Sequence, residues 1–286
     1  KFAGEITARG KGTGAGGAVE TSGAKVQITG RVDASSEAGK GGEWLIDPGD
    51  VVIRNLTGSE TASDTLIDVQ SVKNSLDGGT STTVQTASGD NDYKLTVQDA
   101  ITKTAGGDAT LTLKATGNIS INANITSTAG ALHLDVLSDT NHRAGGNISV
   151  ADGVQIKTRG GNVKLGGGLT ENGIGFANSP NTGVSGIDLG SATIDTTSWS
   201  GDGNIEMAGS TTTGAAGVKL AGTQINVGAG KITIVGKSQS GKGIELNAAA
   251  AIKADSVELR TDSLDLQGTI TGDADPTGSA KIWTLS

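Results

Sequence analysis

Aliphatic residues recur in pairs at positions i and i+2 along the C-terminal third of the chain. The first three pairs begin seven residues apart, and the residue inside each of them is polar. A period of two places the aliphatic side chains on one face of a short strand and the polar side chain on the other. The pattern predicts short strands throughout residues 203–272. The inward positions are Val218/Leu220, Ile225/Val227, Ile232/Ile234, Ile244/Leu246, Ile252, Val257/Leu259, Leu264/Leu266 and Ile270.

The same alternation begins at Leu111, and there a Gly-Asn pair repeatedly precedes the aliphatic residue. The four pairs start at residues 117, 146, 161 and 203, so the gaps are 29, 15 and 42 residues. These gaps share no period, which indicates a degenerate repeat interrupted by loops. Asn tolerates left-handed backbone conformations and bonds nearby backbone groups, so stacked Asn residues are expected to form ladders between coils.

Three strands of this length make a coil of roughly 21 residues, which is within the range of solenoid repeats. Parallel strands need long crossovers, and the chain has almost no helical pattern to supply them. In a β-helix the rest of each coil is the crossover. We therefore predict an all-β, right-handed parallel β-helix spanning residues 1–286 as one unit. An antiparallel sandwich is the rival fold, but it favours two-residue hairpins and more aromatic residues than this chain has.

Residues 56–92 interrupt the alternation and are expected to leave the coil. Val69, Val72 and Leu76 follow helical spacing, with Asp68 as a cap and Gly78 as a stop, which predicts one short helix over residues 68–76. The expected organisation is coils over 1–55, an excursion over 56–116 and repeat coils over 117–286. Residues 166–200 are the least regular part of the repeat coils, and a second departure is expected there.

Composition narrows the function classes. Glycine accounts for 47 of 286 residues, aromatic residues for 2%, and cysteine is absent, so the core is aliphatic and holds no disulfide. The formal net charge of −8 argues against nucleic acid and against adsorption to an anionic membrane. No apolar run reaches the roughly 18 residues of a membrane span. The first residue, Lys1, follows no basic and apolar leader, which predicts a mature or excised segment.

Two motifs near the N-terminus carry a family resemblance. Gly17–Gly23 reads GAVETSG, and Gly41–Ile53 reads GGEWLIDPGDVVI. In this order and at this spacing they resemble the large exoproteins of two-partner secretion, the filamentous-haemagglutinin-like and high-molecular-weight adhesin family. Family members similarly carry a short helical excursion after the Trp motif, and the likeness extends to about residue 117. Trp44 within the motif is expected to be a core anchor of one coil rather than a functional residue.

The resemblance implies a segment of a secreted adhesin at the bacterial cell surface. Such a segment is a stiff rod that presents binding surfaces to receptors, of glycan or protein, on host cells or other bacteria. Family members also reach an outer-membrane transporter through an N-terminal region, which would lie before Lys1. Residues 55–92 and 166–200 are the expected contact surfaces, because loops vary while stacked coils are constrained. A stalk that carries a toxin beyond Ser286 is a further alternative.

The runner-up is a polysaccharide lyase or hydrolase on the same scaffold. Asp262 with Asp265, and Asp273 with Asp275, are its candidate carboxylate pairs, but neither pair has cationic and aromatic neighbours to hold a sugar. The two histidines, His133 and His142, form no ligand cluster. Residues 90–92 (DND) and 273–275 (DAD) are weak calcium candidates. The sequence therefore predicts no enzyme, no catalytic residue, no cofactor and no metal site.

Four Asn-x-Ser/Thr sequons are present. Some adhesins of this family are glycosylated at such positions, so the resemblance implies possible modification here. A structural role for each Asn as a turn or ladder residue is the favoured interpretation. The candidate acceptors are Asn55, Asn118, Asn124 and Asn147.

Overall fold

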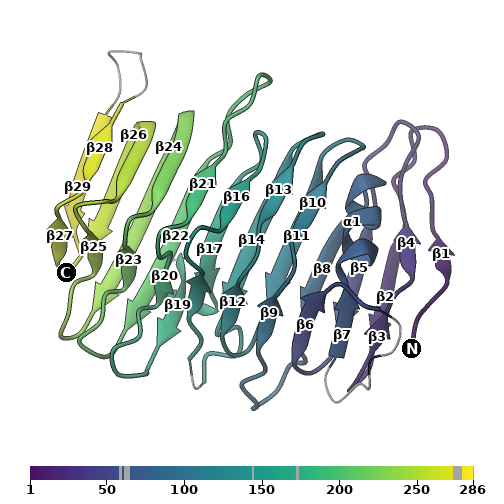
Figure 1. The fold of residues 1–286 in the computed structure, drawn as a ribbon, viewed down its shortest axis with the longest axis horizontal. Helices are drawn as coiled ribbons and strands as arrows, with labels where there is room; N and C mark the ends of the chain where they lie inside the picture. Colours follow the sequence, from purple (N-terminus) through teal and green to yellow (C-terminus); the bar gives the residue numbers. More distant parts are fainter. Residues whose placement is uncertain (58–59, 61–64, 144, 172–173, 273–278, 286) are drawn as a thin grey trace.

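The computed structural model describes residues 1–57, 60, 65–143, 145–171, 174–272 and 279–285. Its strands stack as successive coils along one axis, as Figure 1 shows, and they form three long faces. All strand pairs between described coils are parallel, so the prediction of a parallel β-helix is confirmed. The coils run from the N-terminus at one end of the stack to the C-terminus at the other.

The first face holds ten strands in sequence order. Each strand between β2 and β29 pairs with the one from the coil before and the one from the coil after. They are β2 (Ala18–Ser22), β5 (Glu43–Asp47), β8 (Ser81–Gln85), β11 (Ala109–Lys114), β14 (Leu132–Ser138), β17 (Val163–Gly167), β22 (Ile205–Thr211), β24 (Gln224–Ser238), β26 (Ala251–Thr261) and β29 (Ser279–Thr284).

The second face is a ten-stranded sheet with one strand out of sequence order, because β7 lies between β3 and β6. Its strands, in spatial order, are β3 (Gln27–Ile28), β7 (Thr65–Asp68), β6 (Val51–Arg54), β9 (Leu95–Val97), β12 (Ile119–Ile121), β15 (Ile148–Val150), β20 (Ile187–Asp188), β23 (Val218–Leu220), β25 (Ile244–Leu246) and β27 (Leu264–Leu266).

The third face contains the single helix among the described residues. Long strands β24 and β26 turn the corner and belong to both the first and third faces. The other members, in order, are β1 (Glu5–Thr7), β4 (Arg31–Asp33), α1 (Val69–Asp77), β10 (Ile101–Lys103), β13 (Ile125–Ser127), β16 (Gln155–Lys157), β21 (Thr193–Asp195) and β28 (Thr269–Thr271).

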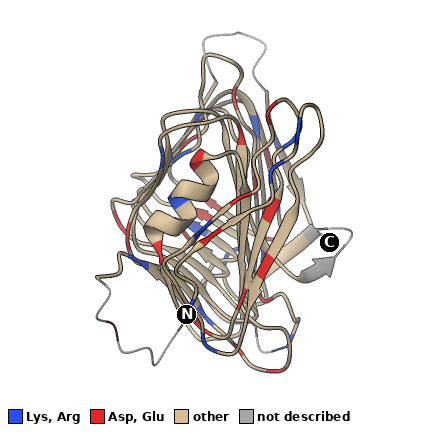
Figure 2. Ribbon diagram, turned by 90° about the vertical axis from the view of Figure 1, so that its right-hand side faces the viewer, with Lys and Arg blue, Asp and Glu red and all other residues tan. Residues whose placement is uncertain are grey.

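Helix α1 forms where the sequence predicts it. The Asp68 side chain accepts a hydrogen bond from the Gln70 backbone N–H, and Gly78 ends the helix. Val69, Val72 and Leu76 are buried, so the helix packs its apolar side into the core between β4 and β10 (Figures 1 and 2). The helix thus occupies the position of a missing strand.

The predicted excursion over residues 56–116 was too long. Strands β7, β8, β9, β10 and β11 from this segment all pair within the stack. The sequence of β8, STTVQ, has Thr82 at an inward position where other strands carry an aliphatic residue. The aliphatic pattern alone therefore misses β8, whereas β9, β10 and β11 carry ordinary aliphatic inward residues, namely Leu95/Val97, Ile101 and Leu111/Leu113.

The second predicted departure, over residues 166–200, is also only partly outside the stack. Strands β18 (Leu169–Glu171) and β19 (Ile174–Ser179) form an antiparallel hairpin, and β19 then pairs in parallel with β22. Strands β20 and β21 return to the second and third faces through buried Ile187 and Ile194. The chain leaves the stack again at residues 196–203.

The core is a continuous column of aliphatic side chains. The predicted inward residues from Val218 to Leu259 are buried, whereas Leu264 and Ile270 are half-buried and Leu266 is 41% exposed near the C-terminal end of the stack. Trp44 is fully buried, as predicted. Its ring lies edge-on to Phe2, and its indole nitrogen donates a hydrogen bond to the Thr21 hydroxyl over 3.0 Å.

Polar side chains replace aliphatic ones at the corner between the third and first faces. Lys103, Ser127, Thr158 and Thr196 occupy equivalent positions in four successive coils and are all buried. The Lys103 ammonium donates to the carbonyl oxygens of Ala105, Gly106 and Ala129, and burial lowers the pKa of this lysine. The hydroxyls of the other three donate to turn carbonyls, so this column fixes the corner.

Candidate functional site

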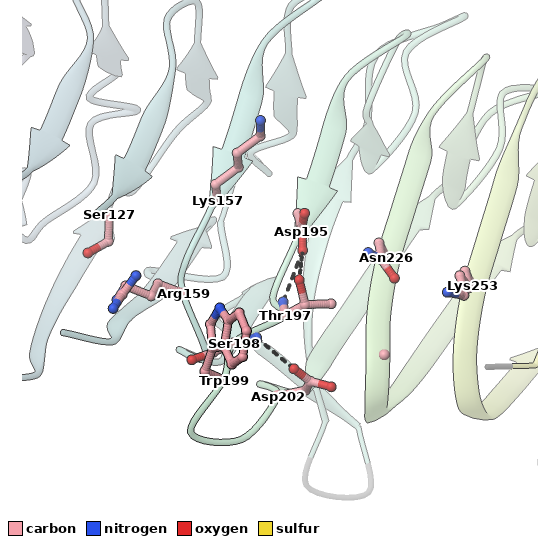
Figure 3. Close-up of a pocket in the computed structure, with 11 residues that line it drawn as sticks. Ser127, Lys157, Arg159, Asp195, Thr197, Ser198, Trp199, Asp202, Asn226 and Lys253 are labelled. Atoms are coloured by element: carbon pink, nitrogen blue, oxygen red, sulfur yellow. Dashed lines mark hydrogen bonds between the residues drawn. The ribbon is translucent and has the colours of Figure 1, made fainter. Parts of the chain in front are cut away.

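A row of polar side chains crosses four neighbouring strands on the outside of the third face. Lys157 on β16, Asp195 on β21, Asn226 on β24 and Lys253 on β26 are aligned in register. Each follows an inward isoleucine, and strand alternation therefore turns it outward. Figure 3 shows the row along the axis of the stack.

A loop over residues 196–203, which we call the Trp arm, rises beside this row. Asp195 holds its start, because its Oδ1 accepts hydrogen bonds from the backbone N–H of Thr197 over 3.0 Å and from the hydroxyl of Thr197 over 2.7 Å. Asp202 holds its end. Its two oxygens accept the backbone N–H groups of Ser198, over 2.7 Å, and of Ala229 in the next coil, over 2.9 Å. Both carboxylates therefore support the arm.

Trp199 sits on the arm and is fully exposed. The arm and the row enclose a groove of about 590 Å³ that also reaches Ser127, Arg159 and Gly228. Figure 3 shows the Trp199 side chain on the loop, between Arg159 and Asp202. Tryptophan is enriched at binding interfaces, because its ring offers a large apolar face and its N–H a hydrogen-bond donor.

The groove carries cations that the protein does not neutralise. Lys157 and Arg159 are exposed, and within the described part of the chain neither forms an ion pair. Arg159 also adopts a left-handed conformation, with φ of 51°. Non-glycine residues adopt this conformation at a cost, and such residues concentrate at functional sites.

Asn226 contributes an unused acceptor to the floor of the groove. Its Oδ1 is buried and has no hydrogen-bond partner. Buried polar atoms without partners are uncommon in folded proteins, so the Asn226 side chain has unused hydrogen-bonding capacity beside the groove.

The sequence pointed to the arm but not to the groove. Trp199 falls within residues 166–200, one of the two expected contact surfaces. The other lining residues are ordinary outward strand or turn positions, with no local motif. These residues are neighbours because they share one register across separate coils. That register cannot be worked out from the sequence, because the coils differ in length.

The Gly-Asn pairs form the expected ladders, at two different corners. Asn118 Oδ1 accepts the backbone N–H of Asn147, 29 residues later, over 3.1 Å. Asn162 Oδ1 accepts that of Asn204, 42 residues later, over 2.8 Å. The irregular gaps arise because these pairs stand at the starts of second-face and first-face strands respectively. Gly146 and Gly203 lie against carbonyl oxygens of the preceding coil, where a Cβ atom would clash.

Two of the four predicted glycosylation acceptors take part in such contacts. Asn118 and Asn124 use Oδ1 to accept backbone N–H groups of the following coil. Asn147 is half-buried, and Asn55 is exposed just after β6. Glycosylation remains a prediction for all four, and Asn55 is the most accessible of them.

The remaining candidates have structural partners. Asp262 accepts the Ser238 N–H over 2.8 Å, Asp265 contacts Gln267, and Asp90 pairs with Arg143 over 3.0 Å. His133 Nδ1 accepts the Asn162 N–H over 3.1 Å. Asp273 and Asp275 lie outside the described residues. Within the described ranges, no three His, Asp or Glu side chains gather closely enough to hold a metal ion.

Comparisons with known proteins do not assign the chain to a family. The chain matches no protein-family model, and a search of curated proteins finds no relative. In the part of the chain that the structure describes, no helix is long and apolar enough to cross a membrane.

Proposed function

We propose that this chain is an adhesive segment of a secreted bacterial exoprotein. The stack acts as a stiff rod, and the Trp arm with its groove is the surface that it presents to receptors on host cells or other bacteria. The single observation that supports this most directly is the fully exposed Trp199 beside the groove. The motifs around Trp44 support a cell-surface location and passage through an outer-membrane transporter.

The rod geometry suits presentation. Strands stack in register over ten positions on one face, at roughly 4.8 Å per strand, which gives an extended body rather than an enclosed cavity. Charged residues of both signs occur on its walls and loops (Figure 2). The binding residues are outward and do not contribute to the aliphatic column, so they are free to vary without loss of the fold.

A polysaccharide-cleaving enzyme is less well supported. The groove does contain two carboxylates, Asp195 and Asp202, but backbone N–H groups engage both of them. A hydrolase needs one carboxyl group to donate a proton and a second to act as nucleophile or base. Incubation with bacterial and host glycans, followed by measurement of new reducing ends, tests this alternative. We expect none.

The adhesive role is tested by measuring how much purified chain binds to host epithelial cells and to bacterial cells. Trp199→Ala is expected to reduce the bound amount severalfold. Trp283→Ala is the matched control, because Trp283 is also exposed, at 53%, but lies on β29 away from the groove. Equal binding by the Trp199 variant and the parent chain would exclude the groove as the adhesive surface.

A further inference from the structure

The charge of the groove contrasts with that of the whole chain. The protein carries a formal net charge of −8, yet Lys157, Arg159 and Lys253 all line one groove. Asp195 and Asp202 line the same groove and accept backbone N–H bonds, so the five charged side chains of the lining sum to a formal charge of +1. Lys157 and Arg159, which form no ion pair within the described residues, are the cations that favour a ligand carrying anions.

The shape of the groove favours an extended ligand. The row residues Lys157, Asp195, Asn226 and Lys253 come from four successive coils of the third face, and the lining also reaches Ser127 at the corner of the coil before them. Neighbouring strands are spaced at about 4.8 Å, so the row repeats polar groups at that interval along the rod. A linear chain of sugar rings has repeats of similar size and can place one ring at each coil.

The aromatic and amide groups favour sugar rings over other anions. Trp199 offers an apolar face against which the C–H face of a pyranose can pack, and Asn226 Oδ1 is an acceptor for a ring hydroxyl. A free phosphate or sulfate would use the cations but neither of these groups. Single-stranded nucleic acid would also use the indole and the cations, so it is the competing ligand in the test below.

We propose that the groove binds a linear polysaccharide bearing carboxylate groups, of the polyuronate class. Trp199 packs against one sugar ring, Lys157 and Arg159 pair with carboxylates, and Asn226 accepts a hydroxyl hydrogen bond. This inference rests on the proposed adhesive function and names the chemical class of its receptor.

The test uses the complete chain and oligogalacturonate as the probe, with binding followed by calorimetry and by tryptophan fluorescence. Trp44 is buried, so the expected change in emission comes from Trp199 and is lost in Trp199→Ala but kept in Trp283→Ala. Lys157→Gln and Arg159→Gln are each expected to weaken binding about tenfold, as loss of one charged hydrogen bond implies. Lys11→Gln, at an exposed turn near the N-terminus, is expected to change nothing.

Two further probes separate the ligand classes. A neutral galactan oligomer of equal length that binds as tightly as oligogalacturonate would overturn the role of the carboxylates. A poly-dT oligonucleotide that binds with the same dependence on Trp199 would overturn the choice of polysaccharide. Affinity for oligogalacturonate is expected to fall as salt rises, because exposed charges are screened.

Different experimental results would refute the proposed ligand class and the proposed adhesive function. Cell binding that depends on Trp199, without any binding of oligogalacturonate, would refute the ligand class and leave the adhesive function standing. Oligogalacturonate binding without attachment to any cell would refute the adhesive function and leave the ligand class intact. Circular dichroism of each variant confirms that the fold is kept, which is expected because every substituted residue is exposed.

Discussion

Asp139 is a buried carboxyl group held in an unfavourable environment. It is 1% exposed, its φ is 50°, and its Oδ1 has no hydrogen-bond partner. Burial raises the pKa of this group from 3.8 to about 6, and nearby Asp92 acts in the same direction. His142 and the backbone N–H groups of Arg143 and Gly145 oppose the rise in pKa. Below the raised pKa the folded protein therefore keeps this carboxyl protonated.

A pH dependence of stability follows from this raised pKa. Between about pH 4 and pH 6 the folded state binds a proton that the unfolded state releases, so the contribution of Asp139 to stability falls as pH rises through this window. Asp139→Asn removes that loss. We expect the variant to gain stability relative to the parent chain from pH 4 to pH 7, measured by urea unfolding midpoints. A difference that stays constant across this range would contradict the assignment.

Helix α1 shows how one element substitutes for another. Among the described residues, no strand pair joins β4 to β10, because α1 lies between them. Side chains at the end of the helix supply the missing backbone partners. The Ser75 hydroxyl accepts from the Val32 N–H over 3.3 Å and donates to the Val32 carbonyl over 2.8 Å. Just beyond the helix, the Thr80 hydroxyl accepts from the Ala34 N–H over 2.9 Å.

Ser75→Ala is expected to destabilise the protein by about 2–4 kcal/mol, because it leaves two buried backbone groups of Val32 without partners. Ser71→Ala is the matched control. Ser71 is buried on the same helix, but its hydroxyl has no hydrogen-bond partner, so its loss is expected to be neutral or slightly stabilising. Urea unfolding of both variants measures the difference. Equal destabilisation would show that the helix does not complete the third face in this way.

Sequence reasoning succeeded where local chemistry decides the element. Alternation of aliphatic residues predicted the coils, and Asp68 and Gly78 predicted the ends of α1. It failed where the position of a strand or side chain depends on pairing with coils that are distant in the sequence. Strand β7 pairs with β3 and β6, but nothing in the sequence of residues 65–68 predicts that this strand lies between them. The groove is hidden for the same reason, since Lys157, Asp195 and Asn226 become neighbours only through coils of unequal length.

Strand β29 is the last described strand of the first face and lies at the C-terminal end of the stack (Figure 1). Strand β29 pairs with β26 on one side, and no described strand pairs with its other side. Every residue of β29 is exposed, including Ile282 at 56% and Trp283 at 53%. An apolar edge strand is a template for pairing with another chain, so this segment is expected to associate with itself at high concentration.

Ile282→Lys is expected to reduce this association, because a charge on an edge strand opposes pairing with a second copy. Light scattering over a concentration series measures the average mass. Gln98→Lys adds the same charge at an exposed position after β9, far from the edge along the chain, and is expected to behave like the parent chain. If the mass of the Ile282 variant rises as steeply as that of the parent, the edge is not the point of contact.

The position of β7 constrains the order in which the protein can assemble. A chain that emerges from its N-terminus and winds one turn at a time would bring β6 directly onto β3. In the finished protein those two strands are held apart by a segment that is synthesised after both. Strands β3 and β6 therefore lack their shared partner until residues 65–68 have been synthesised. The second face at the N-terminal end is completed only after β7 has inserted between them.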